Sequence, residues 1–427
     1  MQLENMLPTK PRKNVLLILA DDLTGALDSG VQFGKNGIDV LVYPSFEAAI
    51  LPSGNHHAQG SAVLVINANT RHSTPEEARS RVKAIVKAFG NYAFFYKKTD
   101  SCLRGNIGAE LEALMEATKS PRLPFVPAFP DLKRITRKGF QYLDGKLIHL
   151  SSMARDPLNP ITESYIPSII GKQSAIPVSV IKRNSAIPEP QNYREILVFD
   201  GKKFKDLRKT ARLLWDRELL RTSAGCAGFA ETLMETVPFE KSTGRNHFKP
   251  LEKFPILVVS GSLHRVSIGQ AVKAQKKKVP GFGLPGERIL QPGWLDSIET
   301  ETLAVECSQG LLENGIAILG TEASLGMTWA IAQGNAQDIS EALGEMVRKI
   351  IEKTGPLHLA IFGGDTLLAI MKTLKYNCIR PLEEIRPGVV LAKAEGQTSK
   401  GLLVTKSGAF GELKLISVIY NYFMYGE

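Results

Sequence analysis

The 427-residue sequence lacks the short motifs that mark several large enzyme classes. It contains no G-x-x-x-x-G-K-[ST] string, which excludes a P-loop, and no G-x-S-x-G string, which argues against a nucleophile elbow. One G-x-G-x-x-G string occurs at residues 281–286, but it follows a proline and contains another. It therefore lacks the strand–turn–helix context of a dinucleotide fingerprint, which disfavours a dinucleotide-dependent oxidoreductase.

Cysteine and histidine are scarce and scattered. The four cysteines form no C-x-x-C pair, and the seven histidines show no zinc-binding spacing. A structural zinc site is therefore not expected. So few and so widely separated cysteines are typical of a protein from a reducing compartment, and we expect buried thiols and a cytoplasmic location.

Long apolar runs are also missing. No run approaches the length that spans a bilayer, and residues 1–13 are polar and lack the apolar region of a signal peptide. We therefore expect no association with a membrane. The formal net charge is +10, but the lysines are scattered and their densest run, residues 276–278, is short. This pattern favours anionic small molecules over nucleic acid as ligands.

The chain is long enough for two or three domains, and 43% of its residues are hydrophobic. Apolar runs of strand length alternate with helical patterns, which predicts an α/β fold. Residues 240–254 are polar and lack apolar periodicity, and they are therefore the best candidate for a linker between domains. We predict two α/β domains, residues 1–245 and 255–427, with mainly parallel sheets and an active-site cleft between the domains.

The first strand carries two carboxylates at its end. Residues 15–20 are apolar and predict a buried strand, which Asp21 and Asp22 follow directly. A turn at Thr24 and Gly25 and a helix over residues 26–36 are predicted next. Ligands of open α/β sheets bind beyond the carboxyl ends of the strands, so these aspartates are candidate catalytic residues. The alternative is an acidic, solvated turn.

Two further polar clusters follow predicted strands. The first includes Arg71, and the second includes Lys98, Asp100 and Arg104. Arginine offers a planar fork to a carboxylate and lysine adds a point charge, so the clusters indicate anion recognition. A structural ion-pair network is the alternative for the second cluster.

In the second half, three loops rich in serine and glycine follow predicted strands. A strand, glycines and a helix present backbone N–H groups and a positive helix end to a phosphate. Simple tight turns are the alternative. The candidate phosphate-binding residues are Ser262, Gly363, Gly364, Asp365, Thr366, Lys406 and Gly408.

Taken in order, these blocks resemble the four-carbon acid sugar kinase family. The resemblance rests on Ala-Asp-Asp-Leu-Thr-Gly-Ala at residues 20–26 and Lys-Lys-Thr-Asp-Ser-Cys-Leu-Arg-Gly-Asn-Ile-Gly at residues 97–108. Shorter blocks at residues 30–33, 127–130, 154–160, 260–262, 362–366 and 406–411 extend it over nearly the whole chain. The chain departs from the family at Asn67, Asn69 and Thr70, where an acidic residue is usual, and at residues 263–265.

The resemblance implies an ATP-dependent kinase that acts on the terminal hydroxyl of threonate, erythronate or an oxo-tetronate. It implies an acid-sugar domain over residues 1–245 and a nucleotide domain over residues 255–427, with Mg²⁺ bridging the ATP phosphates. Asp22 is then the expected base and Asp21 the second choice. The expected substrate-binding residues are Asp21, Asp22, Arg71, Lys98, Asp100 and Arg104, with Lys98 and Arg104 on the carboxylate.

Other functions remain open at this point. A non-catalytic regulator that binds a nucleotide and a sugar acid would keep both pockets without turnover. An aldolase or lyase could use the carboxylates, although two separate ligand domains argue against it. The sequence singles out neither the metal ligands nor the particular acid, and it leaves a homo-oligomer open.

Overall fold

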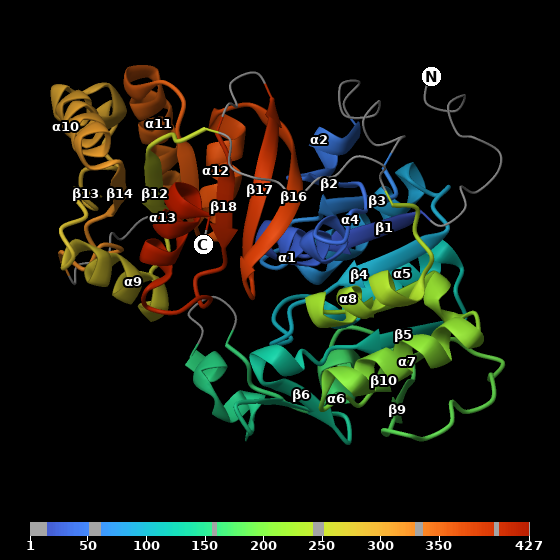
Figure 1. Cartoon of the computed structure of the whole chain (residues 1–427). Helices are drawn as coiled ribbons and strands as arrows, with labels where there is room; N and C mark the ends of the chain where they lie inside the picture. Colours follow the sequence, from blue (N-terminus) through green and yellow to red (C-terminus); the bar gives the residue numbers. More distant parts are fainter. Residues whose placement is uncertain are drawn as a thin grey trace. The chain divides into compact units, whose positions relative to one another are not determined.

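The computed structural model describes residues 15–50, 61–155, 160–241, 252–328, 336–396 and 401–426. The chain divides into two compact units, residues 1–242 and 243–427, and each is built from strands and helices in alternation (Figure 1). The predicted α/β class is therefore confirmed. Residues 242–251 of the predicted linker and residues 156–159 of the 154–160 block lie outside the described residues.

The N-terminal unit contains a run of parallel strands in the order β2-β3-β1-β4-β11-β5-β10-β9. Most of these strands are buried along their whole length, as expected of parallel strands covered on both faces. Their bounds are β1 Leu16–Ala20, β2 Val40–Tyr43, β3 Val63–Asn67, β4 Phe94–Lys98, β5 Arg122–Val126, β9 Val178–Ile181, β10 Glu195–Phe199 and β11 Thr222–Gly225.

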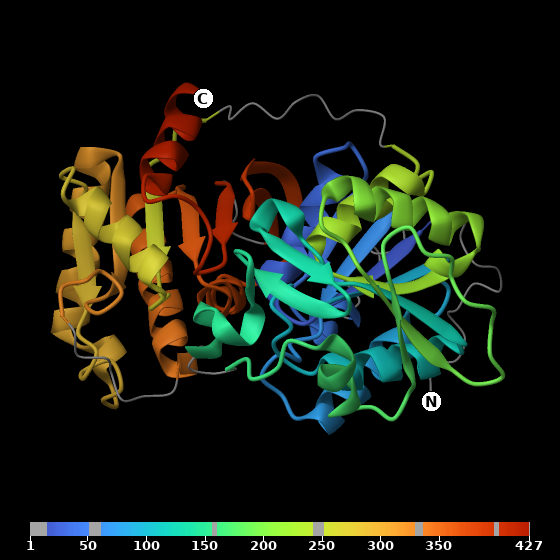
Figure 2. The same ribbon diagram turned by 90° about the horizontal axis from the view of Figure 1, so that it is seen from below.

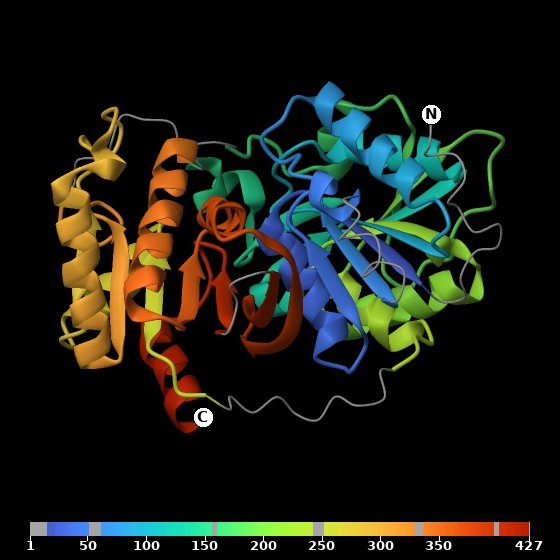
Figure 3. The same cartoon turned by 90° about the horizontal axis from the view of Figure 1, so that it is seen from above.

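Helices pack against one another on the two sides of these strands (Figure 3). One layer consists of α1, α8 and α7, and the other contains α4, α5 and α6. The bounds are α1 Leu23–Gly34, α2 Phe46–Ile50, α4 Pro75–Ala88, α5 Ile107–Thr118, α6 Ile166–Gly171, α7 Phe204–Asp216 and α8 Ala227–Thr236.

Helix α1 begins earlier than the sequence predicts. Asp22 is its N-cap, and Thr24 and Gly25 lie in its first turn rather than in a separate turn. The predicted start at residue 26 is wrong because the Asp22 carboxylate accepts the Gly25 N–H and so caps the helix directly after β1.

A small antiparallel sheet adds to the N-terminal unit. It consists of β6 Arg134–Arg137, β7 Phe140–Leu143 and β8 Lys146–Leu147. Asp144 and Gly145 form a tight turn between β7 and β8, both with positive φ. Asp200, at the end of β10, accepts the backbone N–H groups of Lys138 and Gly139 and so fixes the turn between β6 and β7.

The C-terminal unit contains strands in the order β13-β14-β12-β15-β18-β17-β16, parallel up to β18 and antiparallel beyond it. Helices α10, α11 and α12 pack together in one layer, and α9 packs on α13 in another (Figure 2). The strands are β12 Ile256–Ser260, β13 Gly281–Leu284, β14 Ile316–Thr321, β15 His358–Phe362, β16 Tyr376–Arg386, β17 Val389–Gly396 and β18 Leu403–Lys406. The helices are α9 Arg265–Gln275, α10 Ile298–Asn314, α11 Ala336–Thr354, α12 Gly364–Thr373 and α13 Leu415–Tyr425.

None of the helices in the described part of the chain has both the length and the apolarity that a bilayer requires.

Candidate functional site

Three strand ends meet at one edge of the N-terminal unit. Strand β1 lies between β3 and β4, and in register Ala20 pairs with both Asn67 and Lys98. The residues after these strands therefore lie side by side at the carboxyl edge, where ligands of open α/β sheets bind.

Arg71 lies at the centre of this edge. Its Nε and Nη2 nitrogens lie 2.9 and 2.7 Å from Asp21 Oδ2, and its Nη1 nitrogen lies 2.5 Å from Asp22 Oδ2. Burial alone would lower the pKa of Arg71, but the charges of Asp21 and Asp22 raise that pKa well above its ordinary value. The guanidinium therefore stays charged and fixes the two carboxylates relative to each other.

Asp22 is an ionised and accessible carboxylate. Its oxygens accept the Gly25 N–H at 2.9 Å and the Thr24 hydroxyl at 2.7 Å, in addition to Arg71. Burial alone would raise the pKa of Asp22, but the charges of Arg71 and Lys98 and the two hydrogen bonds lower that pKa below its ordinary value. The Asp22 side chain is 22% exposed, so a small molecule can reach it.

Asp21 is buried beneath this carboxylate. Its side chain is 2% exposed, and no described residue donates to its Oδ1 atom. Its backbone carbonyl accepts the N–H groups of Thr70 and Arg71, which ties the loop after β3 to the end of β1. In this structure Asp21 therefore supports Arg71 and is less open to a ligand than Asp22.

A second group of charges surrounds Asp100. Arg104 Nε lies 2.7 Å from Asp100 Oδ2, and Arg134, from β6, donates to the Ser101 hydroxyl at 2.6 Å. Burial alone would raise the pKa of Asp100, but the charges of Arg104, Arg71 and Arg134 hold it far below its ordinary value. Asp100 is therefore ionised, and the Arg104 side chain remains 23% exposed.

Lys97 and Glu110 form a buried ion pair below the site, with 3.1 Å between Nζ and Oε1. The Thr70 hydroxyl donates to Glu110, and Lys97 Nζ also donates to the carbonyl of Lys98 at 2.9 Å. Burial raises the pKa of Glu110, and the Lys97 charge opposes that rise only in part. The network fixes the loop after β3 to the end of β4, the two segments that carry the site.

The C-terminal unit brings three loops together in the same way. Strands β12, β15 and β18 are adjacent and parallel, and Ser260 pairs with Phe362, which pairs with Lys406. Glycine lets the loops come close, since a Cβ atom on Gly408 would overlap the Ser262 hydroxyl. Gly363 has φ +125°, which residues with side chains rarely adopt.

The start of α12 offers hydrogen-bond donors to a ligand. No described residue accepts a hydrogen bond from the N–H groups of Gly364, Asp365 or Thr366, as expected for a helix N-terminus. The Asp365 side chain is exposed, and the fully buried Ser260 hydroxyl has no partner among the described residues. Free donors, close glycines and a positive helix end fit a phosphate chain.

Lys406 lies beneath these loops. Its Nζ atom donates to the Ser267 hydroxyl at 2.9 Å and to the carbonyls of Ser407 and Gly408 at 3.2 Å, and it lies over the Phe362 ring. Burial lowers the pKa of Lys406 to about 7. Its contacts hold the loop that contains Gly408, and the lysine is 1% exposed.

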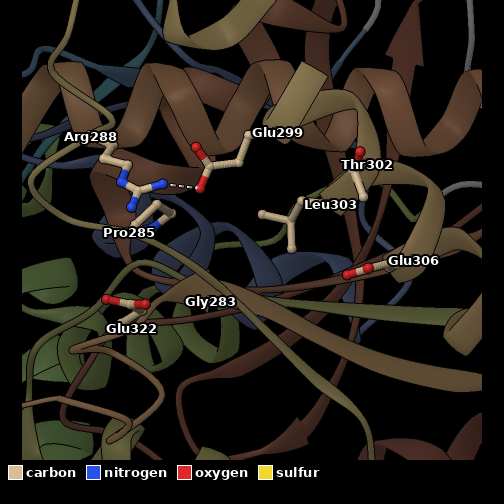
Figure 4. Close-up of a pocket in the computed structure, with 8 residues that line it drawn as sticks. All are labelled: Gly283, Pro285, Arg288, Glu299, Thr302, Leu303, Glu306 and Glu322. Atoms are coloured by element: carbon tan, nitrogen blue, oxygen red, sulfur yellow. Dashed lines mark hydrogen bonds and ion pairs between the residues drawn. The ribbon is translucent and has the colours of Figure 1, made fainter. Parts of the chain in front are cut away.

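A hollow of about 430 Å³ opens elsewhere in the C-terminal unit, at the ends of β13 and β14 (Figure 4). Glu299, Glu306 and Glu322 line it, and its Arg288 is paired with Glu299 at 2.7 Å. Three carboxylates against one paired cation repel a phosphate chain, and none of the predicted site residues lines this hollow. We therefore place no phosphate there.

Two family models match this chain. A model described as a sugar-binding N-terminal domain matches residues 16–233, about half of the chain, and one described as a nucleotide-binding C-terminal domain matches residues 257–416. The sequence is 27% identical over 406 residues to a D-threonate kinase of Bordetella bronchiseptica, covering 92% of this chain and 94% of that protein. It is 25% identical to a D-erythronate kinase of Heliobacterium modesticaldum, covering 96% and 97%.

The chain belongs to the four-carbon acid sugar kinase family. It is thus a sugar acid kinase, as the sequence predicts. Its fold matches the crystal structure of a Salmonella typhimurium LT2 protein provisionally described as a tRNA synthase, with a TM-score of 0.75 and 22% identity over 96% of this chain and 99% of that one. At that identity the match shows the fold alone.

In this kinase the structure adds residues that the sequence does not single out. Arg134 reaches the Asp100 group from β6, more than thirty residues along the chain, and no local motif marks it. Glu110 has a weak signal in the sequence, because it is a carboxylate next to Leu111 in the apolar segment that directly follows the polar block at residues 97–108.

Proposed function

We propose that this protein is an ATP-dependent kinase that phosphorylates the C4 hydroxyl of a four-carbon sugar acid such as threonate, erythronate or an oxo-tetronate. Residues 1–245 bind the acid, and residues 255–427 bind the nucleotide. The observation that carries the proposal is the Asp21–Arg71–Asp22 cluster, a fixed pair of carboxylates beside further cations at the carboxyl edge of the sheet.

The acid binds through charges of the N-terminal unit. Arg104 binds the carboxylate of the acid, because the planar guanidinium can donate to both carboxylate oxygens. The positive charges of Arg71 and Arg134 nearby also attract the acid. Asp22, the accessible carboxylate, accepts a hydrogen bond from the C4 hydroxyl and orients it.

Phosphoryl transfer then needs positioning rather than covalent catalysis. The hydroxyl oxygen forms a bond to the γ-phosphorus, the bond from that phosphorus to the β–γ bridging oxygen breaks, and ADP leaves. Asp22 takes the hydroxyl proton. Asp21 holds Arg71, which in turn fixes the position of Asp22.

The loops of the C-terminal unit bind ATP. The N–H groups at Gly364, Asp365 and Thr366 donate to phosphate oxygens, and Gly363 and Gly408 let the phosphates approach the backbone. The Ser262 hydroxyl, beside Gly408, contacts the same phosphates. Lys406 holds its loop in place from below. Mg²⁺ bound to the phosphates would neutralise their charge; within the described residues, no group of three histidine, cysteine or acidic side chains forms a ready metal site.

A coupled assay of ADP release, run with D-threonate, D-erythronate and a 3-oxo-tetronate and followed by mass analysis of the product, tests the proposal. An acid-dependent release of ADP together with an acid heavier by one phosphoryl group is the expected result. Binding of both ligands without turnover supports the regulator instead, and cleavage of the carbon chain supports an aldolase or lyase.

A further inference from the structure

Lys98 is a buried cation of the N-terminal unit whose ammonium group has no hydrogen-bond acceptor among the described residues. It ends β4 and is 4% exposed, yet no described residue accepts a hydrogen bond from its Nζ atom. Lys97, beside it, is also buried but has Glu110 as its ion-pair partner at 3.1 Å. The negative charge of Asp22 lies near enough to interact with Lys98, but Asp22 accepts none of its hydrogen bonds. A buried ammonium is costly unless something accepts its hydrogen bonds, so the position of Lys98 points to an anionic ligand.

Gly25 makes room for this ammonium. A Cβ atom on Gly25 would lie 2.7 Å from Lys98 Nζ and 2.5 Å from Asp22 Oδ1. The absence of a side chain at Gly25 allows Nζ to approach the first turn of α1. The lysine and the positive end of the helix therefore attract the same anion, directly beside the accessible carboxylate of Asp22.

The neighbours of Lys98 indicate which anion this is. The carboxylate and the C4 hydroxyl of a four-carbon acid lie at opposite ends of its carbon chain. If Asp22 orients the hydroxyl, the acid's carboxylate lies away from Asp22, toward Arg104. The anion that arrives at the hydroxyl end is the phosphoryl group, and lysine is a common ligand of phosphate, which it binds as a point charge.

We propose that Lys98 binds the phosphoryl group during its transfer and does not hold the carboxylate of the acid, the role that the sequence predicts for it. The inference rests on the proposed function and assigns a catalytic residue to it. The ammonium offsets the charge on the phosphoryl oxygens while Asp22 takes the hydroxyl proton. Because the charge is buried and fixed over Gly25, it needs no rearrangement when the phosphoryl group arrives.

Lys98→Met tests this inference, since methionine keeps the length of the chain and removes the charge. The full-length variant is titrated by calorimetry with the acid that the wild type phosphorylates fastest, and then with the purified phosphate ester of that acid. We expect the affinity for the free acid to stay within about threefold and the affinity for the ester to fall at least about tenfold. The kcat should fall by about 10²–10³-fold, the loss typical of a fixed group that stabilises transition-state charge.

Two further variants keep the test decisive. Lys98→Gln also removes the charge but keeps a polar side chain, so it should also weaken the ester more than the acid. Lys83→Met, on the surface of α4, removes the same charge away from the site and should change neither affinity nor kcat. If Lys98→Met cannot be purified in folded form, Lys98→Gln carries the test.

Equal losses of acid and ester in Lys98→Met or Lys98→Gln would overturn the inference and return Lys98 to the substrate carboxylate or to a structural role. A wild-type protein that phosphorylates none of the acids would be a different failure. It would refute the proposed function first, and the role of Lys98 with it.

Discussion

Arg104 Nε donates a 2.7 Å hydrogen bond to the carboxylate of Asp100, four residues before it in the chain. The arginine is thus held in place from one side by an ionised partner, while part of its side chain remains exposed. A preorganised guanidinium loses less rotamer freedom when it binds a carboxylate than a mobile one does.

Arg104→Lys should therefore weaken binding of the sugar acid by about ten- to a hundredfold. A hydrogen bond to a charged group contributes about 1.5–3 kcal/mol, and lysine cannot reproduce the two-point contact. Calorimetry with the acid and with ATP checks this prediction, and the ATP affinity should change little. Equal losses for both ligands would show that Arg104 serves only as the structural partner of Asp100.

Gly408→Ala should raise the KM for ATP and leave that for the acid unchanged. The new methyl group would overlap the Ser262 hydroxyl and lie 3.0 Å from the Cβ atom of His264, so two loops proposed to bind phosphate must separate. Steady-state kinetics with each substrate varied in turn measures the two constants. Gly171→Ala is the control, because Gly171 also lacks a positive φ and its would-be Cβ has no neighbour within 4 Å. An unchanged KM for ATP in folded Gly408→Ala would leave the glycine with a turn-forming role only.

Asp22→Asn should lower kcat by about 10²–10⁴-fold, the usual cost of losing a general base. Asparagine caps helices about as well as aspartate, so α1 should keep its N-cap while the carboxylate charge is lost. Asp21→Asn, measured beside it, separates the accessible carboxylate from the buried one. Near-normal kcat in a folded Asp22→Asn variant would rule out Asp22 as the base.

The lowered pKa of Lys406 predicts that the stability of the fold depends on pH. Burial lowers its pKa to about 7 from an ordinary 10.5, so between these values the unfolded chain binds a proton that the folded chain does not. Stability therefore rises with pH across this window, and below pH 7 the full cost of the buried charge remains. Melting temperatures of the wild type and Lys406→Met, measured from pH 6 to pH 9, check this. The melting temperature of the wild type should rise relative to that of the variant as pH increases above 7. A difference in melting temperature that stays constant with pH would contradict the lowered pKa.

Much of the fold follows from the sequence because its core strands are apolar runs between turns. The apolar residues Leu111, Leu114 and Met115 predict a helix over residues 107–118, and α5 has these bounds. Strand β11, Thr222–Gly225, is missed because its four residues are small or polar, although all are buried in the middle of the sheet. Strand β13 is missed because it coincides with the glycine-rich 281–286 string.

The sequence predicts which residues make up the candidate site but not which of them contact each other. The sequence identifies Asp21, Asp22 and Arg71, since they follow apolar strands, yet the ion pairs that join them depend on the register of β1 and β3. Lys98 differs from Lys97 only in the face of β4 that carries it. One contacts Glu110 and the other approaches Gly25, and neither partner is visible in the local sequence.

Phosphorus NMR of the reaction product tests the central proposal most directly. The wild-type protein is incubated with ATP, Mg²⁺ and D-threonate or D-erythronate, and the coupling of the new phosphate ester to its neighbouring protons is recorded. Transfer to the C4 hydroxyl predicts an ester phosphorus split by the two protons of a CH₂ group, formed in step with ADP. An ester coupled to a single proton would contradict the account. So would the absence of an ester from all of D-threonate, D-erythronate and a 3-oxo-tetronate.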